Sequence, residues 1–157
     1  MKQISSAHLD ELVVAAQASS RRRANLNLHQ TLADPVQRLA IAMEPDTLIL
    51  PHRHAHTWEL LYPVRGRFVV LSFDDGGVVT ERAVLGEQTT LVEIAAGQWH
   101  AVLSLDTGGV IFEVKCGPYR PLDPADSAPC LAGAPAPSAL LGWYRSARSG
   151  ASLAEVQ

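Results

Sequence analysis

The sequence predicts an all-β fold, an antiparallel β-barrel of the jelly-roll type with a short N-terminal helix and a C-terminal extension. Short runs rich in β-branched and aromatic residues follow one another through the middle of the chain, and no helical pattern lies between them. These runs cover residues 47–51, 59–64, 67–73, 78–85, 89–94, 101–105 and 110–115. The turn sequences Asp74-Asp75-Gly76-Gly77 and Asp106-Thr107-Gly108-Gly109 join successive runs as hairpins. Hairpin connections predict an antiparallel topology.

The size and composition indicate one folded domain. The chain has 157 residues, of which 47% are hydrophobic and 18% charged, and this is the composition of a globular protein. A formal net charge of −3 argues against binding to nucleic acid or to an anionic membrane through net electrostatics. We expect an N-terminal helical segment at 1–20, the barrel at 21–120 and a Pro/Ala-rich tail at 121–157.

Two patterns precede the central runs. Residues 7–18 carry Leu9, Leu12, Val13 and Ala16 at helical spacing, which predicts a short amphipathic helix that packs on the barrel. From residue 23 the period changes to two, and Arg23, Asn25, Asn27 and His29 alternate with apolar residues. This polar face is either solvated or the wall of a substrate cavity, in which case Asn25, Asn27 and His29 bind the ligand. The run Arg21-Arg22-Arg23 is either a solvated junction or an anion site.

The C-terminal part changes in composition after Tyr119. Pro, Ala, Ser and Gly dominate as far as Ser138, so we expect an extended tail that adds little to the core. Residues 139–147 are expected to form a short helix that docks on the domain or on a neighbour.

The cysteines and the N-terminus bear on the compartment. Cys116 and Cys130 are the two cysteines, and neither belongs to a CxxC pair, so no disulfide framework is implied. The first twenty residues lack a continuous apolar stretch. We therefore expect a cytoplasmic protein, with a small-molecule ligand, no nucleic-acid or membrane partner, and a homodimer as the candidate assembly.

Three histidines and a glutamate are the candidate metal ligands. His52 and His54 are two residues apart, so an extended chain points both imidazoles to one side. Glu59 joins them only if the chain bends near residues 55–57, and His100 must come from another strand. Such a donor set suits one divalent transition-metal ion, namely Fe, Mn, Zn, Ni, Co or Cu. The alternatives are a polar loop without metal, or a clamp of His54 and His56 in place of His52.

These residues also match a known pattern. His-x-His, four residues, Glu59, six residues and Gly66 resemble the first motif of the cupin superfamily, and Gly97-Gln98-Trp99-His100 resembles the second. The resemblance implies that His52, His54, Glu59 and His100 are metal ligands and that Gly66 is a turn glycine. One position departs from the pattern: Ala95 stands where the second motif usually has proline.

A narrower resemblance covers residues 22–119. It is to the WbuC family of cupin-fold metalloproteins, and its motifs are Asn25-Leu26-Asn27-Leu28-His29, Asp34-Pro35-Val36-Gln37-Arg38, Pro51-His52-Arg53-His54 and Glu113-Val114-Lys115-Cys116-Gly117-Pro118-Tyr119. That family is associated with bacterial O-antigen clusters, which implies carbohydrate metabolism. The leading hypothesis is a metal-dependent enzyme acting on a sugar or sugar-nucleotide derivative, by isomerisation or epimerisation ahead of dioxygenase chemistry. The rival is a non-catalytic, metal-dependent binding or sensing module.

Overall fold

The computed structural model describes residues 1–127 and 135–156. Its elements in chain order are α1 (Ser6–Ala18), β1 (Arg23–Asn27), β2 (Val36–Met43), β3 (Glu59–Arg65), β4 (Phe68–Phe73), β5 (Val79–Leu85), β6 (Val92–Ile94), β7 (Trp99–Ser104), β8 (Gly109–Cys116), η1 (Pro124–Asp126), α2 (Pro137–Ser146) and η2 (Leu153–Glu155). No helix within the described ranges is long and apolar enough to cross a membrane.

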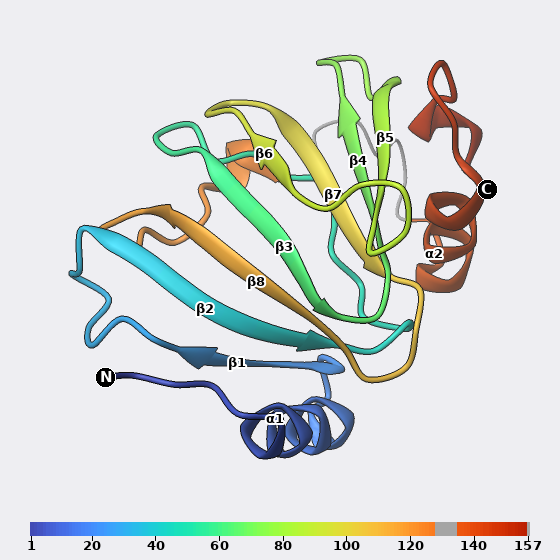
Figure 1. Ribbon diagram of the computed structural model, residues 1–157. Helices are drawn as coiled ribbons and strands as arrows, with labels where there is room; N and C mark the ends of the chain where they lie inside the picture. Colours follow the sequence, from blue (N-terminus) through green and yellow to red (C-terminus); the bar gives the residue numbers. More distant parts are fainter. Residues whose placement is uncertain (128–134, 157) are drawn as a thin grey trace.

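Two antiparallel sheets face each other (Figure 1). The first has the order β1-β2-β8-β3-β6 and the second the order β5-β4-β7. Strands that are far apart in sequence therefore pair, as β2 does with β8 along its whole length. The predicted antiparallel β-barrel is confirmed. The run at 47–51 is not a strand, however: none of its residues pairs with a strand within the described residues, and the next residue, His52, makes only isolated bridges to His100 and Ser127.

The space between the sheets holds one of three apolar clusters. Its buried members come from strands of both sheets and are Met43, Leu61, Phe68, Val70, Leu85, Ile94, Val102 and Ile111. Gly66 makes the tight turn from β3 to β4 with a φ of +75°, a conformation that glycine adopts at least cost. A Cβ at this position would lie 3.2 Å from Gly109 Cα, so the close approach of the β3–β4 turn to the start of β8 also requires glycine.

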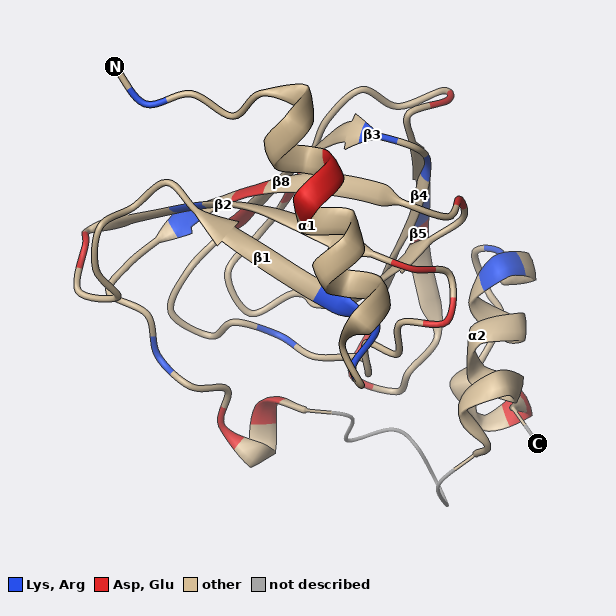
Figure 2. Ribbon diagram, turned by 90° about the horizontal axis from the view of Figure 1, so that it is seen from below, with Lys and Arg blue, Asp and Glu red and all other residues tan. Residues whose placement is uncertain are grey.

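Helix α1 covers the outer face of the five-stranded sheet (Figure 2). Ser5 caps the helix, since its hydroxyl accepts a hydrogen bond from the His8 backbone N–H at 3.3 Å. Leu9 and Leu12 are buried against Ala40 and Ala42 of β2. Helix α1 thus covers the outer face of β2, and the opposite face of the strand lines the interior between the sheets.

The C-terminal segment covers the outer face of the three-stranded sheet (Figure 1). Leu140, Leu141 and Tyr144 of α2, with Leu153 of η2, are buried against apolar side chains of β4 and β7. The helix expected at 139–147 therefore forms and packs on the domain, and the expectation that the tail adds little to the core is wrong for this helix. The physical reason lies in β4 and β7, which are buried on both faces: their face toward α2 is apolar and so needs a cover on the outside as well.

Candidate metal centre

The four predicted metal ligands come from three parts of the chain. His52 lies in the extended segment after β2 and is fastened to β7 by two backbone bonds: its N–H donates to His100 O at 2.9 Å, and the His100 N–H donates to His52 O at 2.8 Å. The chain then turns at residues 55–56, where the Thr57 N–H donates to His54 O at 3.4 Å. This is the bend that Glu59, the first residue of β3, requires.

The second motif is a tight turn. Gly97 has a φ of +79°, and the Gln98 N–H donates to Ala95 O at 3.1 Å across the turn. The Gly97 N–H also donates to His54 O at 2.9 Å, which ties this turn to the first motif. The turn thus forms with Ala95 in the position of the usual proline, because its hydrogen bonds hold it closed.

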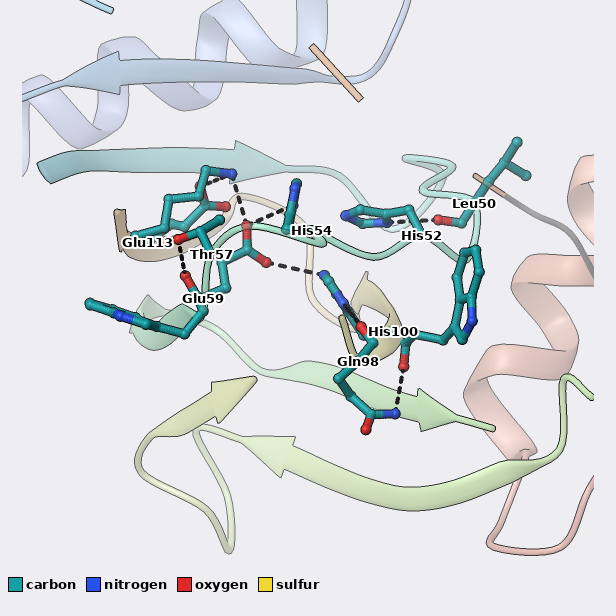
Figure 3. Close-up of polar contacts among 11 residues, drawn as sticks. Leu50, His52, His54, Thr57, Glu59, Gln98, His100 and Glu113 are labelled. Atoms are coloured by element: carbon teal, nitrogen blue, oxygen red, sulfur yellow. Dashed lines mark hydrogen bonds and ion pairs between the residues drawn. The ribbon is translucent and has the colours of Figure 1, made fainter. Parts of the chain in front are cut away.

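The four side chains converge (Figure 3). Each of His52, His54, Glu59 and His100 offers a ligand atom, and these atoms all lie within 4.8 Å of one another. The Glu59 carboxylate lies between two of the histidines, with Oε1 3.1 Å from His54 Nε2 and Oε2 3.1 Å from His100 Nε2. His56 is exposed and lies outside this cluster.

Backbone carbonyls orient two of the imidazoles. His52 Nδ1 lies 2.9 Å from Leu50 O, and His100 Nδ1 lies 2.9 Å from Gln98 O. A carbonyl only accepts hydrogen bonds, so Nδ1 carries the proton in both rings and Nε2 of the neutral ring presents a lone pair. This is the usual arrangement of a metal-bound histidine and its supporting acceptor.

The contact between His100 and Glu59 requires a positive charge. With its proton on Nδ1, neutral His100 directs an Nε2 lone pair at the carboxylate oxygen 3.1 Å away, and two lone pairs at that distance repel. Either a second proton on the ring or a cation held by both groups removes the repulsion. The donor set and this geometry fit one divalent metal ion.

Burial and neighbouring charges set the ionisation of the centre. Burial, together with the charge of His100, lowers the pKa of His52 to about 3, so His52 is neutral near pH 7. Burial alone would raise the pKa of Glu59. The hydrogen bonds from His100 and His54 and the charge of Lys115 outweigh it and hold that pKa well below the usual range. One neutral imidazole and one ionised carboxylate are the forms that bind metal.

Lys115 and Glu113 lie beside the centre. Lys115 Nζ is 2.8 Å from Glu59 Oε1 and 2.8 Å from Glu113 Oε1. Burial and the charge of Glu59 raise the pKa of Glu113 to about 7, against the opposing effect of Lys115. Glu113 and Lys115 lie two residues apart on β8 and so share a strand face, but this spacing does not show that they lie beside Glu59. The register that sets Lys115 opposite Glu59 in the β3–β8 pair decides it.

A cavity of about 510 Å³ is lined by three of the four candidate ligands, His52, His54 and Glu59. Asn25 lies in its wall. Asn27 and His29 are not among the lining residues, so the polar wall expected from Asn25, Asn27 and His29 does not form. Strand β1 ends at Asn27, whose side chain is exposed and accepts a hydrogen bond from Asn25 at 2.7 Å. His29 lies beyond the strand and is buried, where its Nδ1 accepts from the Arg38 N–H at 3.0 Å.

The cavity wall also contains basic residues whose role the sequence alone did not decide. Arg21 and Arg23 line it near the start of β1, and Arg120 lines it from the segment after β8. The sequence signal for Arg21 and Arg23 was the basic run at 21–23. That run by itself does not show on which side of β1 the cavity lies. Cys116 lines the cavity too and is a free thiol, whereas Cys130 lies outside the described residues.

The pKa shifts of Glu113 and His52 act in opposite directions on the acid stability of the metal-free protein. The folded pKa of Glu113, about 7, makes the folded chain bind its proton more readily, so Glu113 adds stability as the pH falls from about 7 to 4.5. Between the unfolded histidine pKa of about 6.5 and the folded value of about 3, the unfolded chain binds more protons at His52 than the folded chain does, so the contribution of His52 to the free energy of unfolding falls as the pH drops below 6.5. The lowered pKa of Glu59 adds a loss in the same direction below the ordinary carboxyl range.

Melting temperatures of chelator-treated protein between pH 7 and pH 4 test this expectation. Relative to wild type, His52→Gln should lose less stability as the pH drops, because it removes the histidine whose pKa is lowered. His8→Gln is the matched control, since His8 is exposed on α1 and a glutamine there keeps the capping bond to Ser5 N–H. Identical slopes in wild type and His52→Gln would contradict the assignment.

The fold and the site were compared with known proteins. The TT1209 protein from Thermus thermophilus has 19% sequence identity and a TM-score of 0.54, over 74% of this chain and 97% of that one. KdgF from Halomonas sp. has 16% identity and a TM-score of 0.50, over 62% of this chain and 80% of that one. A conserved protein of unknown function from Streptococcus pyogenes has 13% identity and a TM-score of 0.50, over 65% and 80%. These likenesses concern the fold alone, which is a β-barrel of the cupin type.

Comparison by sequence found one match. No curated protein matches the chain. One family model does match, over residues 4–85, and this stretch takes in α1, β1, β2, the segment of His52 and His54, and the strands β3, β4 and β5. It covers more than half of the chain and three of the four metal-ligand candidates. On this match the chain belongs to the family described as a domain of unknown function, DUF6016.

Proposed function

We propose that this chain is a metal-dependent cupin that acts on a small polar molecule, with His52, His54, Glu59 and His100 as ligands of one divalent transition-metal ion. The observation that carries this proposal is the convergence of four donors, three of which, His52, His54 and Glu59, line a cavity of about 510 Å³. A cavity of that size suits a small-molecule ligand. The ion would serve as a Lewis acid for an oxygen of the ligand.

The resemblance to the WbuC family supports a sugar or sugar-nucleotide derivative as the substrate, with a place in O-antigen or related carbohydrate metabolism. The amide of Asn25 supports it further, since an amide in the cavity wall can both donate to and accept from hydroxyl groups. We also propose that the protein works in the cytoplasm, because its two cysteines follow no disulfide or metal-binding spacing.

The Glu113–Lys115 pair supports an enzyme rather than a passive binding module. Isomerisation and epimerisation move a proton between a carbon and a base, so they need a proton-transfer group in reach of the ligand. Both side chains line the cavity, and Glu113 is joined to Lys115 at 2.8 Å. Glu113 is the proposed base, with Lys115 as the group that positions it.

Glu113→Gln tests this role. The variant should keep its metal and its ligand affinity but lose turnover by about 100-fold or more, the usual contribution of a general base. The assay would follow nucleotide sugars and sugar acids by NMR, in protein whose metal content is known from elemental analysis. Glu93→Gln, an exposed carboxylate of β6 outside the cavity wall, is the control.

The rival function has its own outcome in that assay. Saturable binding of one of these compounds by wild-type protein, with no conversion over long incubation, would identify a non-catalytic metal-dependent binding module. A wild-type protein purified without metal and unable to take up any of the six candidate ions would overturn the proposed function itself.

A further inference from the structure

Arginines of the cavity wall differ from those of the surface. Among residues 1–127 and 135–156, the guanidinium groups of Arg21, Arg23 and Arg120 make no ion pair or hydrogen bond. Surface arginines have partners: Arg65 Nη1 lies 2.8 Å from Asp10 Oδ1, and Arg67 Nη2 lies 2.8 Å from Asp106 Oδ1. The cavity therefore contains cationic groups without counter-ions from the described chain.

Arg23 has the least favourable surroundings for a positive charge. It is half-buried in the cavity wall, and burial followed by the charge of Arg21 lowers its pKa. Burying a charge costs free energy unless a partner compensates for the lost hydration, and a second cation nearby adds to that cost. An anionic group placed between Arg21 and Arg23 would offset both effects.

The strand register places Arg23 far from the candidate metal ligands. Arg23 lies opposite Met43 in the β1–β2 pair, whereas Lys115, which contacts Glu59, lies opposite Gln37 in the β2–β8 pair. Six residues of β2 separate Met43 from Gln37, which is about 20 Å of strand. Arg23 and Glu59 therefore stand toward opposite ends of one elongated cavity.

The wall between these two ends is mostly aliphatic, with Asn25 opposite Ile41 and Glu113 opposite Leu39 as its polar residues. Leu39 and Ile41 of β2 line it, together with Ile111 of β8 and Ile49 of the extended segment. Arg120 belongs to the end near the metal ligands, because its charge acts on His56. The cavity thus has a metal-ligand end, a mostly apolar middle and a cationic end at Arg21 and Arg23.

We propose that Arg21 and Arg23 form a subsite for the carboxylate or phosphate group of a ligand whose other end reaches His52, His54, Glu59 and His100. This inference rests on the proposed function and narrows its substrate to organic anions long enough to span the cavity. Sugar nucleotides meet that description, whereas sugar acids and sugar phosphates of a single ring are too short and neutral sugars lack the charge. A planar guanidinium can bind either oxyanion with two parallel hydrogen bonds.

Inorganic phosphate and acetate are the probes, titrated separately at constant ionic strength into zinc-loaded protein. Backbone amide NMR signals of residues 21–25 report on the subsite, apart from any anion that binds the zinc. Wild type should show saturable shifts with at least one probe, and the stronger probe identifies phosphate or carboxylate as the preferred group. Arg23→Gln should weaken that binding by about tenfold or more, as expected for a charged hydrogen-bonded contact.

Arg38→Gln is the matched control, since Arg38 lies on the adjacent strand β2, is exposed and does not line the cavity. It should leave the dissociation constant unchanged. Absence of saturable shifts at residues 21–25 in wild type, or equal affinities in wild type and Arg23→Gln, would overturn the subsite. Zinc per chain, measured on the same samples, tests the proposed function separately: a wild type without zinc refutes the metal centre, while normal zinc without an anion response refutes the subsite alone.

Discussion

His100→Ala is expected to lower the metal affinity by more than about 100-fold, because changes to the mere supporting partners of a metal ligand already cost 10- to 100-fold. The side chain of His100 is buried, its Nε2 faces Glu59, and its Nδ1 is held by Gln98 O. Alanine removes that donor and leaves the Glu59 carboxylate with one histidine contact fewer. Metal per chain, measured by elemental analysis after dialysis, should fall from near one to near zero.

A second variant keeps the test informative if His100→Ala does not fold. His54 is more exposed than His100, with a side-chain relative accessibility of 16% against 1%, so His54→Ala should fold while losing metal in the same way. His56→Ala is the matched control, two residues along the chain and outside the cluster. Metal loss in His56→Ala equal to that in His54→Ala would overturn the ligand assignment, and full metal in both His54→Ala and His100→Ala would overturn the centre.

Leu140→Ala is expected to destabilise the protein by about 2–5 kcal/mol, the range for a buried leucine truncated to alanine. Leu140 lies in the apolar cluster between α2 and the outer face of β4 and β7, and it is 1% exposed. The free energy of unfolding from denaturant titration measures the loss. Val14→Ala, at a position of α1 that is 65% exposed, should change it by no more than about 0.5 kcal/mol.

Equal effects of Leu140→Ala and Val14→Ala would show that the C-terminal segment does not belong to the core. Tyr144→Phe separates packing from hydrogen bonding at the same interface. It removes only the bond from Tyr144 Oη to Ile49 O, at 3.1 Å, and should cost about 1 kcal/mol. Ile49 lies three residues before His52, so this bond also fastens the segment that carries two of the candidate ligands.

Local patterns were sufficient for much of the fold and for the candidate ligand set. The two-residue periods and the Gly, Pro and Asp turns predicted antiparallel β structure because these signals depend on neighbouring residues alone. The spacing of His52, His54 and Glu59 was also a local signal, since one extended segment and one bend bring the three side chains together. His100 required only a resemblance in its turn, which forms around Gly97 as expected.

The sequence-based predictions were wrong where the structure depends on pairing between distant strands or on burial of both faces of a sheet. The segment at 47–51 has the composition of a strand, but none of its residues pairs with a strand within the described residues, and only isolated bridges form at the next residue, His52. His29 continues the alternation of β1 in sequence, yet the strand stops at Asn27 and His29 turns inward to Arg38. Composition also did not show that α2 belongs to the core, because the helix follows a Pro/Ala-rich stretch. The helix covers the apolar outer face of β4 and β7.

The sequence by itself determined the all-β class, the turns and the order of the metal-ligand candidates, because each depends on residues within a few positions of one another. Only the tertiary structure decided which other groups share the cavity. Lys115 contacts Glu59 through the β3–β8 register, and Arg23 lies at the far end of the cavity through the β1–β2 register. A shift of either strand by one residue would turn these side chains to the opposite face, so their place depends on pairings between distant parts of the chain.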